Sequence, residues 1–332
     1  MKLYQKDGYF NAESVIEDSS VFKFVTGARG TGKTYGCLKY LISKGKTFIY
    51  LRRTEEESKL QRKYESSSLS KNIDDMEIDF NFGSLSGKVG YITAGKAVIY
   101  TCALSTFSKI RGVNFDNVDY ILYDEFIPET HVRSIKGEGL ALMNIFETVN
   151  RNRELSGDEP VKMICLSNSL NIANDVFMEF DLIRNAEDLL YSEEEFYRRG
   201  NLLLIIMKDS PISKKKENTA LYQSSSKQFY EMAIKNKFVL NDFSYVVKKP
   251  LKEYVPVINV GDLYFYKHKS NIEWYVTFTK ATLTKEKCFE SSITGLERFK
   301  NTQWKYYERY IDGYIKFDSY EAIALFEKYF TK

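Results

Sequence analysis

The sequence predicts an α/β fold, in which a mostly parallel sheet with flanking helices is followed by a smaller α/β domain. Apolar runs of strand length alternate with helical patterns as far as residue 209, which is typical of parallel strands joined by helical crossovers. Residues 211–227 (PISKKKENTALYQSSSK) are polar and basic and interrupt that pattern. Aromatic-rich strands follow, and 332 residues favour two domains over one.

Strands and helices are expected in a definite order in the first region. Strands are expected at 21–26 (VFKFVT), 47–52 (TFIYLR), two arms of a hairpin within 87–101, 118–123 (VDYILY) and 161–166 (VKMICL). Helical segments are expected at 33–43, at 59–71 together with a loop, and at 139–149. In the last of these, Leu140, Met143 and Phe146, with Val149, are expected to form the apolar face.

Three regions follow from this pattern. We expect a first domain over residues 1–209, a linker over 210–235 that can be partly helical, and a second domain over 236–332. In the second domain, strands are expected in FVLNDFSYVV, DLYFYKH and EWYVTFTK, and a helix over residues 320–330.

Composition excludes some classes of function and leaves others open. The 48 basic and 45 acidic residues give a net charge of +3, so nucleic-acid binding has to come from local patches. Four cysteines without a CxxC pair indicate a reducing cytoplasm, and two histidines are too few for a histidine-based metal site. We expect no signal peptide, and the longest apolar run, at 202–207, is too short to span a membrane.

A phosphate-binding loop follows the first strand directly. Residues 27–34 read GARGTGKT, which matches G-x-x-x-x-G-K-[ST], and the segment after it is helical. The glycines let backbone N–H groups turn toward phosphate oxygens, the lysine adds a positive charge, and the threonine hydroxyl can ligate Mg²⁺. Arg29 can reach a phosphate, pair with an acidic neighbour or face solvent. The residues expected to bind ATP are Gly27, Ala28, Arg29, Gly30, Thr31, Gly32, Lys33, Thr34 and Tyr35.

An acidic pair completes the ATP site. The apolar strand YILYDE ends in Asp124 and Glu125. A carboxylate at this position can hold the water shell of Mg²⁺, so Thr34 and Asp124 are the expected metal residues. Glu125 is expected to be the general base that activates the attacking water. Because many P-loop kinases and GTPases lack this glutamate, its presence indicates the additional-strand class of P-loop ATPases, which includes RecA-like and terminase-like proteins.

Two more residues are expected to contribute to catalysis. Asn168 ends the strand MICLSN and is the candidate sensor of the γ-phosphate, although an asparagine there can also cap a turn. Arg151 ends the helix over 139–149 and is the candidate arginine finger supplied to a neighbouring subunit, with Arg153 in reserve. A cation at a helix carboxyl end is also favoured by the helix dipole alone.

These segments together resemble the DNA-packaging ATPase, or encapsidation protein, of small short-tailed phages with protein-primed genomes. The resemblance rests on GARGTGKT, YLRR (50–53), YDEF (123–126), RNRE (151–154) and CLSN (165–168) in that order, and on DGYIKFD (312–318) before an apolar helix. It is dense over residues 21–170 and thin from 210 to 310. The acidic pair and the P-loop are shared with all large terminases, so the narrower match depends on the other segments.

The resemblance implies an ATP- and Mg²⁺-dependent motor that translocates double-stranded DNA into a preformed capsid. It implies a homopentameric ring docked on the capsid portal in the host cell cytoplasm. A structural packaging RNA and a terminal protein on the DNA are further implied partners. In that family Arg151 would be the trans-acting arginine, and the second domain would be RNase H-like without nuclease activity.

Contacts to DNA are expected to reach phosphates rather than bases, because a packaging motor has to accept any sequence. Arg52 and Arg53, at the end of a core strand, can lie near the nucleotide or pair with the glutamates at 55–57. The candidate DNA contacts are Lys109 and Arg111 in the loop SKIRG, and Lys214, Lys215 and Lys216 in the linker. Each can also be a solvated charge, and the SKIRG pair can equally face the ATP of a neighbouring subunit.

Four alternatives to the packaging motor remain open at this level. One is a terminase with an active nuclease, for which Asp242, Asp262, Asp312 and Asp318 are the available carboxylates, although no strand carries a DxxxD run. A second is another DNA-translocating or helicase-like ATPase. A small-molecule kinase is disfavoured by Glu125 and by the aromatic second domain. A non-hydrolysing binding module is disfavoured by the intact Lys33, Thr34, Asp124 and Glu125.

Overall fold

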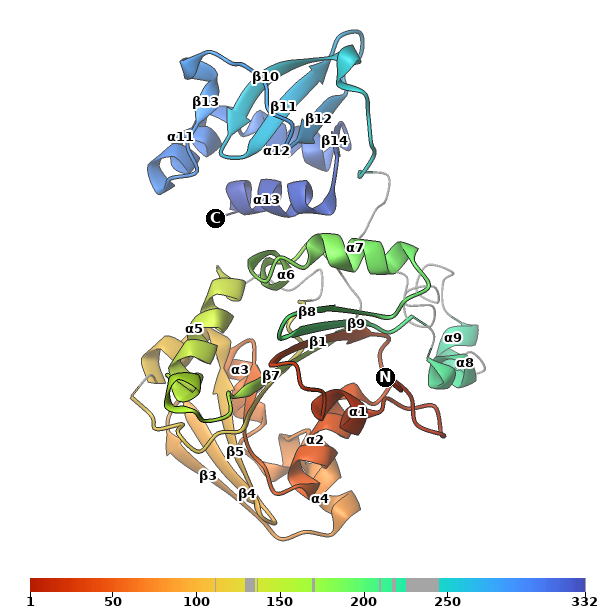
Figure 1. Ribbon diagram of the computed structural model, residues 1–332, viewed down its shortest axis with the longest axis vertical. Helices are drawn as coiled ribbons and strands as arrows, with labels where there is room; N and C mark the ends of the chain where they lie inside the picture. Colours follow the sequence, from red (N-terminus) through yellow and green to blue (C-terminus); the bar gives the residue numbers. More distant parts are fainter. Residues whose placement is uncertain are drawn as a thin grey trace. The chain divides into compact units, whose positions relative to one another are not determined.

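The protein consists of two compact units, each with its own sheet (Figure 1). The structure is a computed structural model and describes residues 1–110, 112–128, 135, 137–168, 171–208, 210–216, 219–224 and 245–331. Unit 1 comprises Met1–Asn171 and Asp188–Val239, and unit 2 comprises Ile172–Glu187 and Leu240–Lys332. The structure therefore differs from the expected boundaries, since residues 172–187 group with the carboxyl-terminal part of the chain.

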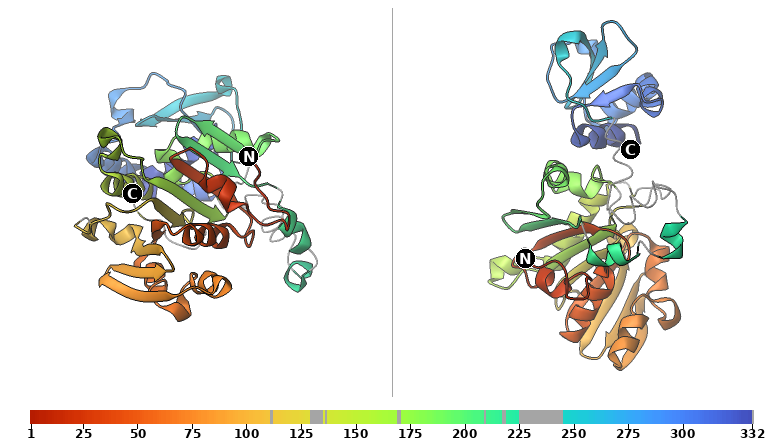
Figure 2. Two further views of the ribbon diagram at one scale, coloured as in Figure 1. Left: turned by 60° about the horizontal axis from the view of Figure 1, so that its bottom comes forward. Right: turned by 90° about the vertical axis from the view of Figure 1, so that its right-hand side faces the viewer.

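Unit 1 is built on a nine-stranded sheet with the order β3-β4-β5-β2-β6-β7-β1-β9-β8 (Figures 1 and 2). Neighbouring strands from β5 to β9 in this order are parallel, and the antiparallel strands β3, β4 and β8 lie toward its two edges. The predicted mostly parallel sheet is confirmed. The strands are β1 (Phe22–Gly27), β2 (Thr47–Arg52), β3 (Phe80–Ser86), β4 (Val89–Ala94), β5 (Ala97–Ala103), β6 (Tyr120–Asp124), β7 (Lys162–Asn168), β8 (Phe196–Arg199) and β9 (Leu202–Ile206).

The strand order places the expected site residues together at the carboxyl ends of the central strands. Since β1, β2, β6 and β7 are parallel, their carboxyl ends meet, and ligands of open α/β sheets bind at that end. Strand β7 lies between β1, which leads into the P-loop, and β6, which ends in Asp124. This is the additional strand that the acidic pair predicted.

Side chains alternate along each strand, so the buried residues of the sheet lie on its two faces. Val25, Tyr50 and Leu122 belong to the same buried cluster as the apolar side of helix α2, with Leu38 and Leu41. The intervening residues of each strand point to the opposite face, because successive side chains of a strand alternate. Figure 1 draws α1, α2 and α4 together on one side of the sheet.

Helix α3 of unit 1 begins with a clear local signal, whereas α2, α4 and α5 begin without a side-chain cap. Helix α3 has a capping box, in which the Thr54 side chain accepts from Glu57 N and the Glu57 side chain accepts from Thr54 N. The α-helices are α1 (Ala12–Ile16), α2 (Lys33–Ser43), α3 (Glu55–Leu60), α4 (Ser70–Met76), α5 (Glu138–Asn150), α7 (Ile183–Tyr191, which runs from unit 2 into unit 1), α8 (Pro211–Lys216) and α9 (Ala220–Gln223). Short 3-10 helices lie at Tyr64–Ser66, Leu104–Ile110 and Arg153–Ser156. Helices α8 and α9 confirm helical content within the expected linker.

The expected apolar face of α5 was wrong in part. Leu142, Ile145 and Val149 are buried, whereas Leu140 is 55% exposed. Both sets recur at helical spacing, so periodicity alone did not distinguish them. Phe146 lies at the border and packs against Phe22, with ring centroids 4.6 Å apart.

Unit 2 contains a five-stranded sheet in the order β13-β10-β11-β12-β14. The antiparallel meander β10-β11-β12 forms its centre, and the parallel strands β13 and β14 form its edges. The unit is α/β as predicted, and its RNase H-like character stays a prediction. Its elements are α6 (Asp175–Glu179), β10 (Tyr254–Val260), β11 (Leu263–His268), β12 (Trp274–Thr277), β13 (Cys288–Phe289), α11 (Ile293–Gln303), α12 (Lys305–Ile311), β14 (Ile315–Phe317), α13 (Tyr320–Thr331) and 3-10 helices at Leu251–Glu253 and Lys285–Lys287.

Aromatic side chains form much of the core of unit 2. Phe265 and Phe326 lie with their ring centroids 5.8 Å apart, and both belong to a chain of ring contacts that includes Tyr306, Tyr310 and Phe330. The high aromatic content of the sequence thus serves packing here. None of the described helices has the length and apolarity needed to cross a membrane.

Candidate nucleotide-binding site

The P-loop joins β1 to α2 and is shaped by its glycines. Gly30 and Gly32 have φ values of +67° and +87°, which L side chains rarely adopt. Gly32 is the N-cap of α2 and leaves the first N–H groups of that helix without a side-chain cap. These groups are therefore available to an anion, at the end of the helix that favours negative charge.

Lys33 is buried and held by the loop itself. Its Nζ donates to the carbonyls of Gly27 (3.0 Å) and Ala28 (2.8 Å) and to Thr31 Oγ1 (3.3 Å). Burial lowers the pKa of the Lys33 ammonium to about 8, and the nearby Asp124 carboxylate opposes that shift. A polyphosphate would favour the charged form in the same way.

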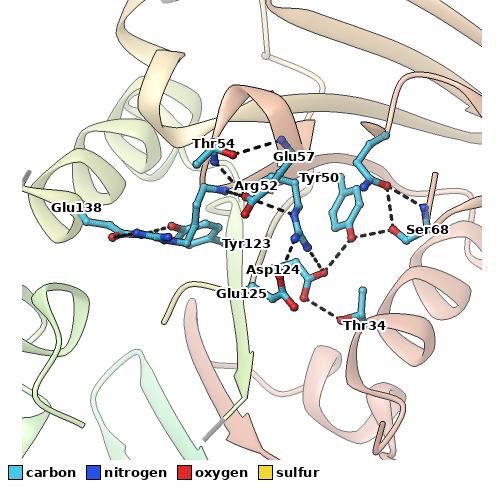
Figure 3. A network of polar contacts seen from close by, with 12 residues as sticks. Thr34, Tyr50, Arg52, Thr54, Glu57, Ser68, Tyr123, Asp124, Glu125 and Glu138 are labelled. Atoms are coloured by element: carbon cyan, nitrogen blue, oxygen red, sulfur yellow. Dashed lines mark hydrogen bonds and ion pairs between the residues drawn. The ribbon is translucent and has the colours of Figure 1, made fainter. Parts of the chain in front are cut away.

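Asp124 is held by three donors from two elements, α2 and β2, as Figure 3 shows. Its Oδ1 accepts from Thr34 Oγ1 (2.8 Å), and its Oδ2 accepts from Tyr50 OH (2.9 Å) and Arg52 Nη1 (2.7 Å). Burial raises the pKa of this carboxyl above its usual range, while the Arg52 guanidinium and the hydrogen bonds act against the rise. The Thr34–Asp124 contact brings together the two residues expected to hold Mg²⁺.

Glu125 is the first residue after β6 and has an unusual backbone. Its φ of +60° is uncommon for a residue other than glycine and is a strain typical of functional positions. Its side chain is half exposed, and Oε2 accepts from Arg52 Nη2 at 2.7 Å. Arg52 therefore bridges both carboxylates of the acidic pair, and the role of Glu125 as general base stays a prediction.

The two arginines of YLRR lie on opposite faces of the sheet. Arg52 lies on the side of Asp124 and Glu125, whereas Arg53 is 2% exposed and pairs with Glu138 on the other side. Arg53 Nε and Nη2 donate to the two carboxylate oxygens of Glu138 at 2.7 and 2.9 Å, and Tyr123 OH donates to the same group at 2.6 Å. Of the glutamates at 55–57, Glu57 lies 3.9 Å from Arg52 Nε through its Oε2, which also accepts from Arg53 N at 3.1 Å. The Glu138 partner was missed, because its place depends on how α5 packs.

A cavity of about 230 Å³ lies over these groups. It is lined by the loop and by the carboxyl ends of β6 and β7, through Gly30, Thr31, Gly32, Lys33, Thr34, Tyr35, Asp124, Glu125, Ser167 and Asn168. Asn168 is thus placed beside the acidic pair, as its position at the end of a core strand predicted. Of the other expected ATP residues, Arg29 is exposed, and Tyr35 OH donates to Asp75 Oδ2 at 2.6 Å.

The candidate finger residues lie away from this cavity. Arg151 is the C-cap of α5, has a φ of +48° and is 53% exposed, and its Nη1 contacts Asp116 Oδ1 at 2.6 Å. Arg153 donates to the carbonyls of Val118 (2.8 Å) and Asp116 (2.6 Å), which gives it a structural task. Neither arginine lines the cavity of its own chain, so the role of Arg151 in a neighbouring site stays a prediction.

The candidate DNA-contacting residues have different environments. Lys109 and Lys214 are exposed, and Arg111 lies outside the described residues. Lys215 Nζ donates to Asp7 O at 3.1 Å, and Lys216 Nζ contacts the P-loop. The role of these residues in DNA binding stays a prediction.

The chain is similar to known proteins in sequence and in fold. The family model described as Podovirus DNA encapsidation protein (Gp16) matches residues 4–330. A DNA packaging protein of Bacillus phage PZA is 28% identical over 252 residues, which cover 74% of this chain and 70% of that protein. Two solved structures share the fold. "The Phi-28 gp11 DNA packaging Motor" has a TM-score of 0.65 at 19% identity and 98% coverage of both chains. "The bacteriophage Phi-29 viral genome packaging motor assembly" has a TM-score of 0.60 at 22% identity, with 97% of this chain and 99% of that chain covered.

Proposed function

This chain belongs to the podovirus DNA encapsidation protein family, and from that premise we propose that it is the ATP-hydrolysing subunit of the packaging motor. The family match covers nearly the whole chain, so encapsidation of viral DNA is its function. ATP hydrolysis coupled to translocation of double-stranded DNA is our proposal for how it performs that function.

The arrangement of Lys33, Thr34, Asp124 and Glu125 around one cavity carries this proposal. Thr34 and Asp124 fit Mg²⁺, which prefers oxygen ligands and usually binds through one or two carboxylates together with substrate phosphates. Bound there, Mg²⁺ would neutralise charge on the β- and γ-phosphates. Lys33 would leave the loop carbonyls for the phosphates, Glu125 would orient the attacking water, and Asn168 would contact the γ-phosphate.

The assembly that completes the site is also a proposal. Arg151 at the exposed end of α5 is suited to reach a neighbouring subunit, which requires a closed ring, and we propose a pentamer docked on the capsid portal. Double-stranded DNA is the substrate that the ring moves. A structural packaging RNA and a terminal protein on the DNA are the further partners we propose, with the motor acting in the host cytoplasm on the procapsid.

A terminase with an active nuclease is the main alternative. Asp318 accepts a hydrogen bond from Thr277 Oγ1 at 2.5 Å and one from Phe278 N at 3.3 Å, so it is held within the fold of unit 2. Among the described residues, no group of three histidine, cysteine or acidic side chains could hold a metal ion, while Asp242 lies outside them. A nuclease that uses two metal ions needs more convergent carboxylates than this.

One experiment tests ATPase and nuclease activity together. Purified protein with Mg²⁺ and ATP should release phosphate faster when duplex DNA is added, and a plasmid in the same tube should stay uncut. Lys33→Ala should give no turnover, because the phosphate charge is no longer neutralised, while its circular dichroism spectrum stays that of the wild type. Turnover in the folded variant would exclude the P-loop as the site. Linearised plasmid, lost on changing Asp242, Asp262 or Asp312, would favour the terminase alternative.

A further inference from the structure

Helix α8 lies against the outside of the P-loop. Lys216, its last residue, donates from Nζ to the carbonyls of Arg29 (2.8 Å) and Gly30 (2.9 Å). A Cβ atom at position 30 would lie 2.1 Å from this Nζ, so the space for the ammonium exists because residue 30 is glycine. The P-loop motif itself does not require an outer cation, which makes this contact an additional feature of the chain.

A second set of contacts holds α8 in this place. Gly8 has a φ of +94°, and a Cβ atom there would lie 3.0 Å from Pro211 Cβ, so the two backbones pack closely. Lys215 Nζ donates to Asp7 O at 3.1 Å, and Ile212 is buried. The same amino-terminal loop is tied to the P-loop, since Phe10 N donates to Thr31 O at 2.9 Å. The amino-terminal loop, the P-loop and α8 thus form one packed group within unit 1.

The two carbonyls that Lys216 contacts belong to peptide groups that a phosphate would use. The Arg29 carbonyl shares its peptide group with the N–H of Gly30, and the Gly30 carbonyl shares its group with the N–H of Thr31. A cation that hydrogen-bonds to a carbonyl polarises the peptide group and strengthens the N–H on its other side as a donor. Gly30 and Thr31 both line the cavity, where P-loop N–H groups cradle phosphates.

The charge of Lys216 also acts on Lys33 and on a phosphate bound by the P-loop. After burial, which is the larger cause, the positive charge of Lys216 also lowers the pKa of Lys33. Burial in turn lowers the pKa of Lys216 below its ordinary value. Two cations on one loop repel each other when the loop is empty, and a polyphosphate between the peptide N–H groups would favour both.

We propose that Lys216 is a positioning residue for ATP, which strengthens the Gly30 and Thr31 N–H groups from the outer side of the P-loop and links ATP binding to the docking of α8. The proposal rests on the proposed function only in taking ATP as the P-loop ligand. The link is reciprocal, because a contact that raises affinity for ATP is itself stabilised when ATP binds.

The test uses the full-length chain and three variants. Lys216→Met should bind a fluorescent ATP analogue with Mg²⁺ about five- to tenfold more weakly, as expected for the loss of charge-assisted hydrogen bonds. Lys216→Arg should recover most of the affinity, because a guanidinium can reach the same two carbonyls. Lys6→Met is the matched control, since it removes an exposed lysine from the amino-terminal loop of the same group, and it should bind as the wild type does. KM for ATP should rise with Lys216→Met while kcat stays within about twofold.

A second readout separates positioning from simple stability. Adding the ATP analogue should slow amide hydrogen exchange in residues 211–216 of the wild type, and Lys216→Met should lose this response at a temperature where it stays folded. The proposal is overturned if Lys216→Met binds the analogue as tightly as the wild type does, or if α8 exchanges at the same rate with and without nucleotide. A fall in Tm that Lys216→Arg does not reverse would assign Lys216 a purely structural role. If the wild type fails to bind the analogue, the proposed function fails instead.

Discussion

Replacing Glu125 with glutamine should slow ATP hydrolysis by about two to four orders of magnitude, the usual contribution of a general base, while Mg²⁺–ATP still binds within a few-fold of wild type. Glutamine keeps the shape of glutamate, but its amide is too weak a base to accept the proton of the attacking water. Arg52 loses one carboxylate partner and keeps the other, Asp124, so the metal residue stays in place.

The measurement is a comparison of nucleotide affinity with single-turnover hydrolysis for the wild type and Glu125→Gln. Asp124→Asn is the contrasting variant, because it removes the metal residue next to Glu125 and should weaken binding of Mg²⁺–ATP itself. If Glu125→Gln instead loses nucleotide binding, Glu125 binds the metal ion or stabilises the fold. The assignment of the two carboxylates would then have to be reversed.

Loss of Arg151 should lower ATP turnover in assembled rings by about three to five orders of magnitude, the range measured for arginine fingers. The side chain is 53% exposed at the end of α5, contacts the exposed Asp116 and does not line the cavity of its own chain. Its effect is therefore expected in a neighbouring site. Isolated subunits should hydrolyse ATP slowly with or without the arginine, because neither has a neighbour.

Mixing two inactive variants tests whether the arginine acts in trans. Arg151→Ala subunits keep Glu125, and Glu125→Gln subunits keep Arg151, so mixed rings should contain some complete sites and recover turnover that neither variant has alone. Recovery of DNA packaging should be poorer than recovery of hydrolysis if the subunits act in sequence. Mixed rings that demonstrably form without recovering turnover would contradict the trans role.

Arg153→Ala is the comparison for the same mixing experiment. Arg153 lies two residues away from Arg151 and donates to two backbone carbonyls. Its loss should therefore reduce the stability of the fold and leave the arginine that a neighbouring subunit receives in place. Arg153→Ala subunits should therefore retain function as arginine donors at temperatures where they stay folded. If they fail as donors while Arg151→Ala subunits succeed, Arg153 is the finger.

Much of the site could be predicted because its residues follow directly from short motifs at strand ends. GARGTGKT, Asp124, Glu125 and Asn168 each lie at the carboxyl end of an apolar strand, and parallel strands bring such ends together. The additional strand β7 lies between β1 and β6, as expected for the additional-strand class of P-loop ATPases that Glu125 indicated. The sheet and the helix over residues 320–330 were also accessible to periodicity, since both are long and regular.

The contacts of the site that could not be predicted from the sequence join segments that are distant along the chain. Arg52 meets Asp124 because β2 pairs with β6 in a register that sets Leu51 opposite Tyr123, and no local pattern contains that register. Arg53 finds Glu138 only once α5 covers the far face of the sheet. Lys216 looked like a solvated linker charge, and its contact with the P-loop requires the packing of α8 on the amino-terminal loop.

The central claim is that this chain uses ATP hydrolysis to move DNA into a capsid, and protection of DNA from nuclease tests it most directly. Procapsids, genomic DNA and wild-type protein are incubated with ATP, and DNase is then added. Full-length DNA should be protected in the presence of ATP, and none with a slowly hydrolysed ATP analogue or with Lys33→Ala, although both are expected to form the docked complex. Equal protection with the analogue or with Lys33→Ala would show that DNA enters without hydrolysis at this site and would contradict the account.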